Sequence, residues 1–342
     1  QREVKKKTRS KLSPKLIPHL YEHKNYCIHY RNLKFIKELG IELGTLHNVV
    51  SFTQKKFLEP YILHNNKLRT KAKNDFEKDY FKLLNNSVFG KTMQNVRNQM
   101  NLHLTVDNDN AVKWFSRPDF KNSEDINGLH MIETHKTKII YDKPVYIGCC
   151  ILDISKIKMM DFHYNVIHKQ FGECGYNLIY SDTDSFVYEI FVNDVYDWMK
   201  LNKQWFDLSD CKRNYLQNNK NKKKLGFFKD ELNGDPMSTF AGCNPKSYSF
   251  DYQTMVDEII SKKETSKAKG VSTTVVKNTM PLTDYVDTIM NDIILKRGVI
   301  GFRSFGHAVK TIETQKDALT SYYDKFEMID NINCRPYGYK KS

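Results

Sequence analysis

Two β-rich runs enclose a short acidic tip near the middle of the chain, and this pattern constrains the fold more than any other. Leu178-Ile179-Tyr180 leads into Ser181-Asp182-Thr183-Asp184-Ser185, and Phe186 to Ile190 follows at once. Strand-forming runs separated by so short a polar segment predict a β-hairpin. The aromatic residues Tyr180 and Phe186 beside the tip favour a hairpin set into a core over a surface loop.

The tip carries two carboxylates one residue apart, Asp182 and Asp184. Like charges this close repel each other unless a cation neutralises them. Mg²⁺ commonly binds one or two carboxylates together with substrate phosphates, so the tip predicts a phosphate-handling magnesium site. The alternative is an acidic turn exposed to water. A two-metal site for phosphoryl transfer would need another carboxylate from a neighbouring strand.

The charge balance favours a polyanionic partner. The chain has 54 Lys and Arg against 40 Asp and Glu, a net charge of +14, and nucleic acid is the first candidate partner. The other explanation is AT-rich coding, which favours lysine codons whatever the protein binds. The cluster Lys220 to Lys224 suits a solvated loop as well as a contact surface. No apolar stretch approaches the ~20 residues needed to cross a bilayer, which argues against a membrane protein.

The seven cysteines form no CxxC pair and no zinc-ligand spacing, which suits a reducing, intracellular compartment. The first residue is Gln1, and the basic segment after it has no apolar core like that of a signal peptide. We therefore expect an intracellular chain that is a piece of a longer protein.

Before the acidic tip, the pattern predicts a lysine-rich helical hairpin. Its helices would span about 43 to 64 and about 71 to 97, joined by the polar turn Asn65-Asn66-Lys67. Helical spacing puts four residues on an exposed face of the second helix and four apolar ones on a packed face: Lys78, Lys82, Asn86 and Phe89, against Phe76, Tyr80, Leu83 and Leu84.

Gly90 lies within that second helix, where glycine costs ~1 kcal/mol relative to alanine, and its small size lets another group approach the backbone. The alternative without a functional role is an ordinary amphipathic helix with a solvated face.

The remaining chain mixes helical and strand patterns, which predicts the α+β class. We expect a strand at 102–106, a short helix at 112–116 and a polar loop at 122–127. Next come a strand pair interrupted by Asp142-Lys143-Pro144 and a helix at about 151–170. A β-rich stretch at 226–252 and a mixed region at 270–342 follow.

Three segments in this order resemble family B DNA polymerases of the protein-primed type, found in viruses, linear plasmids and Maverick/Polinton transposons. Lys82-Leu83-Leu84-Asn85-Asn86-Ser87-Val88-Phe89-Gly90 is similar to the fingers motif K-x3-N-S-x2-(Y/F)-G. Tyr180 to Ser185 is similar to the palm motif Y-x-D-T-D-S, and Lys246-Ser247-Tyr248 to the K-x-Y motif. The likeness extends from about Lys15 to Lys325 and is greatest to the transposon-type sequences.

The resemblance implies a role for each matched residue. Lys82 would bind the triphosphate of an incoming dNTP, Asn86, Ser87 and Phe89 would shape the pocket around the nucleotide, and Gly90 would leave room for the base pair. Asp184 would be the principal Mg²⁺ ligand with Asp182 as its catalytic partner, and Lys246 and Tyr248 would hold the primer strand.

The resemblance also implies a right-hand polymerase, with a palm sheet and packed helices, helical-hairpin fingers and a small thumb. The segments would be a palm part at 1–42, fingers at 43–97, an insertion-like segment at 98–135, the palm with the catalytic hairpin at 136–269, and the thumb at 270–342.

The implied activity is template-directed DNA synthesis, in which a primer 3′-hydroxyl attacks the α-phosphate of a dNTP with two Mg²⁺ ions sharing the developing charge. The implied partners are primer–template DNA, dNTPs and a terminal protein that supplies the first hydroxyl. A nuclear location is implied, with a mitochondrion or a viral factory as alternatives.

The sequence departs from the family at one catalytic segment. A palm strand D-x2-(S/N)-L-Y should precede the fingers, and the most similar string, Pro18-His19-Leu20-Tyr21-Glu22, lacks the acid. Two hypotheses follow: part of a working nucleotidyltransferase, or a noncatalytic DNA-binding remnant of a mobile element. A reverse transcriptase is disfavoured because its palm hairpin usually reads YxDD.

Overall fold

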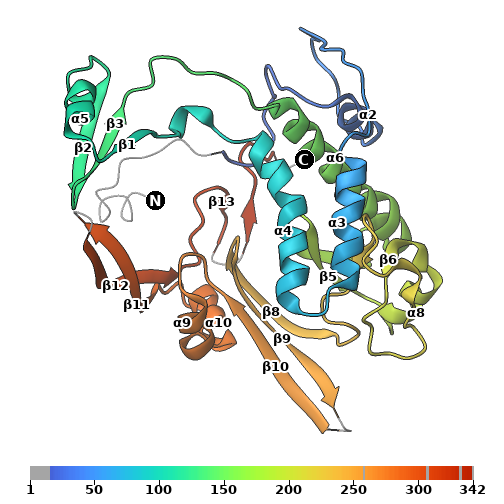
Figure 1. The fold of residues 1–342 in the computed structure, drawn as a ribbon. Coiled ribbons are helices and arrows are strands. Elements are labelled where there is room, and N and C mark those ends of the chain that lie inside the picture. Colours follow the sequence, from blue (N-terminus) through green and yellow to red (C-terminus); the bar gives the residue numbers. More distant parts are fainter. Residues whose placement is uncertain (1–15, 257–258, 306–307, 331–332, 341–342) are drawn as a thin grey trace.

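The computed structural model describes residues 16–256, 259–305, 308–330 and 333–340. Helices and several small, mostly antiparallel sheets alternate along the chain, which confirms the predicted α+β class. In Figure 1 helices α3, α4 and α6 lie on one side of the view and the β1–β3 sheet lies on the other. Within the described ranges, no helix is both long and apolar enough to cross a bilayer.

The helices are α2 (Tyr30–Glu38), α3 (Glu59–Lys71), α4 (Asp75–Thr92), α5 (Asn108–Phe115), α6 (Val145–Asp161), α7 (Lys169–Phe171), α8 (Val195–Leu201), α9 (Thr273–Thr279) and α10 (Leu282–Met290). A π-helical segment, Phe162–His168, joins α6 to α7, and short 3₁₀ turns occupy Val96–Asn98, Lys203–Trp205 and Asn219–Asn221.

The strands are β1 (Asn101–Thr105), β2 (Phe120–Ile126), β3 (Leu129–Thr134), β4 (Tyr176–Asp182), β5 (Ser185–Ile190), β6 (Phe206–Asp207), β7 (Phe228–Lys229), β8 (Met237–Asn244), β9 (Ser247–Val256), β10 (Ile259–Lys267), β11 (Leu295–Phe305), β12 (Ala308–Leu319), β13 (Glu327–Met328) and β14 (Cys334–Arg335).

The predicted helical hairpin exists, but its boundaries were wrong. Asn65-Asn66-Lys67 lies inside α3, and the turn falls at residues 72–74. Pro60 stands in the first turn of α3, where its missing N–H costs nothing, so the helix begins there and not at residue 43. Asn74 caps α4 by accepting a hydrogen bond from the Glu77 N–H, which fixes the start of that helix.

The predicted packed face of α4 was wrong for three of its four residues, because only Leu84 is partly buried. Phe76 and Leu83 are 79% and 63% exposed, and Tyr80 is exposed as well. The face that meets α3 carries Leu84, whose carbonyl accepts from the Tyr61 hydroxyl at 3.4 Å. The neighbouring side chain, Asn85, accepts a 3.0 Å hydrogen bond from Asn65 of α3. Polar contacts to α3 therefore set the rotation of α4, and the aromatic spacing does not.

Residues 101–134 form a small sheet in the order β1-β3-β2, with α5 packed on it. The polar loop predicted at 122–127 is wrong, because most of it is strand β2. β2 lies at the edge of the sheet, where polar side chains can face solvent. Asn127 and Gly128 both have positive φ and make the hairpin turn to β3, which is the conformation that this residue pair favours.

Helix α6 begins at Val145, directly after Pro144, where a second strand was predicted. Its residue Gly148 is buried against the end of α4. A Cβ at this position would overlap the Met93 side chain and lie 2.8 Å from Oγ1 of Thr92. Glycine therefore lets α6 and α4 approach closely, and this crossing joins the helical hairpin to the rest of the chain.

The predicted β-hairpin is confirmed as β4 and β5, which pair in antiparallel register with Asp182 opposite Ser185. Its half-buried aromatic residues, such as Phe186 and Tyr188, pack on a core built from Phe162 and neighbouring buried side chains. The acidic tip therefore lies at the end of a hairpin that packs on the protein core.

Strands β8, β9 and β10 form a three-stranded sheet next to this hairpin, and α9 and α10 pack against it. Ala241 and Cys243 of β8 share a buried cluster with Val276 of α9 and Tyr285 of α10. The long two-stranded ribbon β11–β12 follows. Figure 1 shows this ribbon directed toward the β1–β3 sheet.

Candidate active site

The acidic tip is a tight turn whose shape is fixed by one backbone and one side-chain hydrogen bond to the same carbonyl. The Asp184 N–H donates to the Asp182 carbonyl at 2.6 Å, and the Ser185 hydroxyl donates to the same carbonyl at 3.2 Å. Thr183 between the two acids has φ of 56°, a conformation that a β-branched residue rarely adopts. The strained turn keeps both carboxylates at the end of the hairpin.

Asp182 meets the K-x-Y segment. Its Oδ2 accepts a 2.6 Å hydrogen bond from Nζ of Lys246, 64 positions further along the chain. A second contact joins the same segments, because the backbone N–H of Lys246 donates to the Tyr180 hydroxyl at 3.0 Å. The fold therefore brings two of the three recognised motifs into direct contact.

This ion pair shifts the pKa of both partners. The hydrogen bond from Lys246, with a smaller one from Thr183, holds the pKa of Asp182 below its usual value, although burial acts in the opposite direction. Asp182 in turn raises the pKa of Lys246. Both groups are charged at neutral pH, so one carboxylate of the tip is already neutralised by an ammonium.

Tyr248, the last residue of the K-x-Y segment, lies beneath the hairpin. Its ring centroid is 5.0 Å from that of Tyr180 and 5.5 Å from that of Phe240. Lys267 of β10 has its Nζ 5.5 Å from the centre of the Tyr248 ring. Tyr248 is therefore fixed by aromatic packing directly below the acidic tip.

Asp184 differs from Asp182 because its carboxylate is exposed and no partner contacts it within the described part of the chain. Asp184 with Asp182 supplies the one or two carboxylates that Mg²⁺ takes when waters and substrate phosphates fill its other positions. Across the described ranges, no group of three acids, histidines or cysteines lies close enough to hold a metal. These two carboxylates would hold a magnesium ion only if water or phosphate oxygens supplied its remaining ligands.

The fingers-like residues lie on α4 and do not touch the tip. No hydrogen bond, ion pair or ring contact joins described residues 82–90 to the described acidic hairpin. Lys82, Asn86, Ser87 and Gly90 are exposed, and Phe89 is half-buried. A Cβ added at Gly90 would meet nothing within 4 Å, so its surface faces open space.

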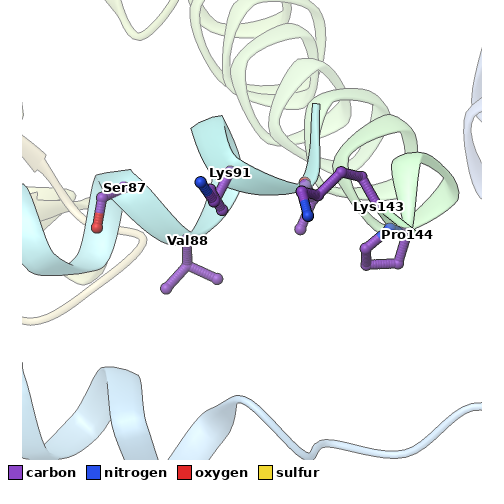
Figure 2. Close-up of a pocket in the computed structure, with 6 residues that line it drawn as sticks. Ser87, Val88, Lys91, Lys143 and Pro144 are labelled. Carbon is purple, nitrogen blue, oxygen red and sulfur yellow. The ribbon is translucent and has the colours of Figure 1, made fainter. Parts of the chain in front are cut away.

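A pocket of about 360 Å³ lies on another side of the same helix. Figure 2 shows Ser87, Val88 and Lys91 of α4 facing it, with Lys143 and Pro144 at the start of α6. Of the residues to which the resemblance gives a role, Ser87 lines this pocket, and no described residue of the acidic hairpin does. We therefore place the candidate site at the hydrogen-bonded Asp182–Lys246 pair and not at this pocket.

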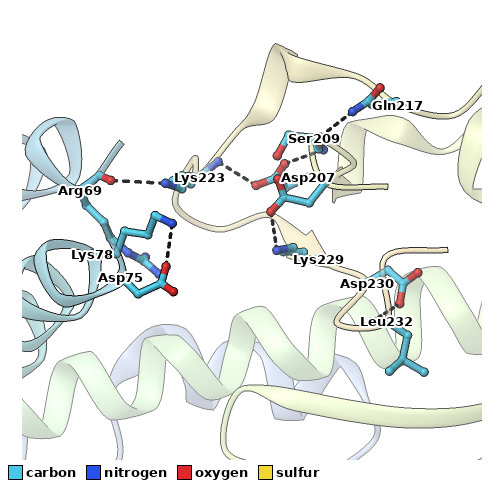
Figure 3. Close-up of polar contacts among 11 residues, drawn as sticks. Arg69, Asp75, Lys78, Asp207, Ser209, Gln217, Lys223, Lys229, Asp230 and Leu232 are labelled. Atoms are coloured by element: carbon cyan, nitrogen blue, oxygen red, sulfur yellow. Dashed lines mark hydrogen bonds and ion pairs between the residues drawn. The ribbon is translucent and has the colours of Figure 1, made fainter. Parts of the chain in front are cut away.

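Lys223 makes contacts that help to hold the helical hairpin in place. In Figure 3 Lys223 lies between α3 and the buried carboxylate of Asp207. Its Nζ donates to the Arg69 carbonyl at 3.3 Å, and its backbone N–H donates to Asp207 at 2.7 Å. Lys223 of the Lys220 to Lys224 cluster is thus an internal contact of the chain, and the lysine run itself gave no sign of it.

Comparison with protein-family models, with curated proteins and with solved structures finds no match to this chain.

Proposed function

We propose that this chain is the polymerase module of a protein-primed family B DNA polymerase. The observation that carries the proposal is the contact between Asp182 and Lys246. A Y-x-D-T-D-S tip and a K-x-Y segment matter to a polymerase only if they lie together, and they are 64 positions apart in sequence.

Each residue then has a defined task. The free carboxylate of Asp184 binds the metal, and Asp182 supports it while held in place by Lys246. A bound magnesium ion supplies charge neutralisation for the nucleotide phosphates. Lys82 offers an exposed ammonium to the triphosphate, and Asn86 offers an exposed amide beside it.

Lys246 and Tyr248 place the primer end at the acids, where its 3′-hydroxyl attacks the α-phosphate and pyrophosphate leaves. Template pairing selects the nucleotide, so protein contacts go mainly to the DNA backbone and weaken with salt. The right-hand architecture, a terminal-protein primer and action in the nucleus belong to the same proposal.

A second candidate is a noncatalytic DNA-binding remnant of a mobile element. The observation that favours it is the metal-ligand count. At the described tip of the hairpin the acids are Asp182 and Asp184, and Asp182 is already paired with Lys246. Two-metal phosphoryl transfer uses further bridging ligands. This candidate predicts DNA binding without nucleotide incorporation.

The two candidates are separated by primer extension with the natural protein that carries this chain. A labelled primer annealed to a template is incubated with one dNTP and Mg²⁺. The polymerase adds the nucleotide only when it is complementary to the template base, and needs the metal and the primer 3′-hydroxyl. DNA binding with no addition under these conditions would favour the remnant.

A further inference from the structure

The sheet β8–β10 has two unlike faces. On one face, Tyr285 of α10 donates its hydroxyl to the Lys267 carbonyl at 3.0 Å, and the Leu282 N–H donates to Glu264 at 2.7 Å. Helices α9 and α10 cover that face. The other face carries Tyr248, Phe250 and Tyr252 of β9, which are only partly buried.

These three rings continue the aromatic packing that begins at Tyr180. The centroids of Tyr248 and Phe250 are 6.2 Å apart with planes only 18° from parallel, and those of Phe250 and Tyr252 are 6.1 Å apart. Phe240 of β8 lies opposite Phe250 and contacts both Tyr180 and Tyr248. A line of rings therefore runs from the acidic tip along the sheet.

Lysines accompany the rings on the same face. Residues directly opposite each other in adjacent strands share a face, and β10 pairs Lys267 with Tyr248 and Lys263 with Tyr252. Both lysines are exposed. We call the surface formed by Tyr248, Phe250, Tyr252, Lys263 and Lys267 the aromatic–lysine face.

The acids of the sheet lie on the opposite side. The register places Asp251 and Glu264 across from each other on the face that α9 and α10 cover. Nζ of Lys262 lies 2.5 Å from Oδ2 of Asp251 and forms an ion pair with it, but the two groups are not aligned for a hydrogen bond. In the described parts of β8–β10, the aromatic–lysine face carries positive charge and no carboxylate.

The face has a defined length. One end is the Lys246–Asp182 pair, and the other is closed by Lys212, which donates to Thr254 at 2.8 Å and also pairs with Asp235. Tyr248 and Tyr252 are four positions apart, which is about 13 Å at the rise of a β-strand. That length fits at most about four nucleotides at a base-stacking rise of ~3.4 Å.

We propose that the aromatic–lysine face binds a short unpaired DNA segment that leads from the primer site. Duplex bases are already stacked on each other, whereas unpaired bases can pack on aromatic rings while their phosphates meet lysines. The assignment rests on the proposed function, because it uses the primer site at Lys246 as the start of the path.

The test is binding of a fluorescent 12-nucleotide oligothymidylate and of a matched duplex by the natural protein, measured by anisotropy over a range of salt. F250L/Y252L should weaken oligothymidylate binding on the order of 10-fold. K263Q/K267Q should reduce the slope of log affinity against log salt by about 1.4, since each phosphate contact contributes ~0.7. T265K, which adds a charge between the two lysines, should steepen the slope by about 0.7.

The matched control is K37Q/K277Q, which removes two exposed lysines from α2 and α9. It should leave the affinity and the slope unchanged. Circular dichroism checks that each variant is folded. The assignment would be overturned if folded face variants bound oligothymidylate like the parent, or if they lost duplex binding as much as oligothymidylate binding.

Primer extension by the same proteins separates this assignment from the proposed function. If the face variants bind oligothymidylate like the parent and the parent extends primers, the assignment of the aromatic–lysine face is wrong and the proposed function stands. If the variants show the predicted binding changes but the parent never extends a primer, the proposed function is wrong and the face remains a single-strand binding site.

Discussion

Asp182 and Lys246 form a 2.6 Å charged hydrogen bond between the tip of the β4–β5 hairpin and the turn that precedes β9. The folded-state pKa of Asp182 lies below its ordinary value of 3.8, so the pair contributes stability above that value and loses it as the pH falls through the lower, folded-state value. The pKa of Lys246 is raised above 10.5, so its contribution is complete below that pH and is lost as the pH rises further.

Lys246→Gln should therefore lower the stability of the protein between about pH 5 and pH 10, and the difference from the parent should shrink in stronger acid. Because both groups are partly exposed, the effect should be modest. Urea unfolding at pH 7 and at pH 2.5 checks this. A stability difference that grows on acidification would contradict the ion pair.

Two glycines on crossing helices should respond in opposite ways to the same change. Gly148→Ala places a Cβ against Met93 and Thr92 and should destabilise the protein by about 1–3 kcal/mol. Gly90→Ala meets open space within α4 and should stabilise by up to about 1 kcal/mol.

If Gly90 leaves room for the base pair, Gly90→Ala should also slow nucleotide incorporation while the protein remains folded. Thermal unfolding and single-nucleotide extension on the same samples give both readings. Equal stability changes at the two positions would mean that the close approach of α6 to α4 is wrong.

Lys82→Ala should raise the KM for dNTP, because the exposed ammonium is removed from the triphosphate. Lys91→Ala is the matched control, since it removes the same charge from a different face of α4. Steady-state extension at varied dNTP concentration measures both. Unchanged dNTP kinetics for Lys82→Ala would exclude Lys82 from the site.

Asp207→Ala should destabilise the protein by about 2 kcal/mol or more. The buried carboxylate accepts hydrogen bonds from the Lys223 N–H at 2.7 Å and the Ser209 N–H at 3.1 Å, and the substitution leaves both donors without a partner. Asp207→Asn keeps one side-chain acceptor and should cost less. Urea unfolding of the two variants ranks them, and equal losses would argue against these hydrogen bonds.

The parts of the fold that the sequence predicted well are those with strong local signals. The β4–β5 hairpin combined two strand-forming runs with a short polar tip, so its position was predictable, whereas the pairing of Asp182 with Ser185 was not. Helix α5 and strand β1 also lie close to where the periodicity placed them.

The boundaries and buried faces of other elements were predicted wrongly, because they depend on end signals such as a proline or a cap, or on contacts with distant segments. Pro60 and the Asn74–Glu77 cap marked the true starts of α3 and α4. The apolar residues before Leu152 suit a strand as well as a buried helix, and periodicity alone does not distinguish them. The exposure of Phe76 and Leu83 depends on contacts between α3 and α4 that no spacing reveals.

At the candidate site, the sequence supplied the residues and the fold supplied their proximity. Nothing in the spacing of Asp182 and Lys246 indicates that they meet, and only the resemblance placed both near a primer end. Residues 82–90 remain separate from the tip, because α4 contacts α3 and α6. Lys223 in turn contacts α3 through the Arg69 carbonyl.

The most direct test of the polymerase assignment is the rate of single-nucleotide incorporation by an Asp184→Asn variant of the natural protein, with saturating primer–template, dNTP and Mg²⁺. Glu189→Gln, an exposed acid of the same hairpin, is the control. We predict that Asp184→Asn loses at least about 100-fold in rate while Glu189→Gln incorporates like the parent. An Asp184→Asn variant that incorporates as fast as the parent would contradict the account.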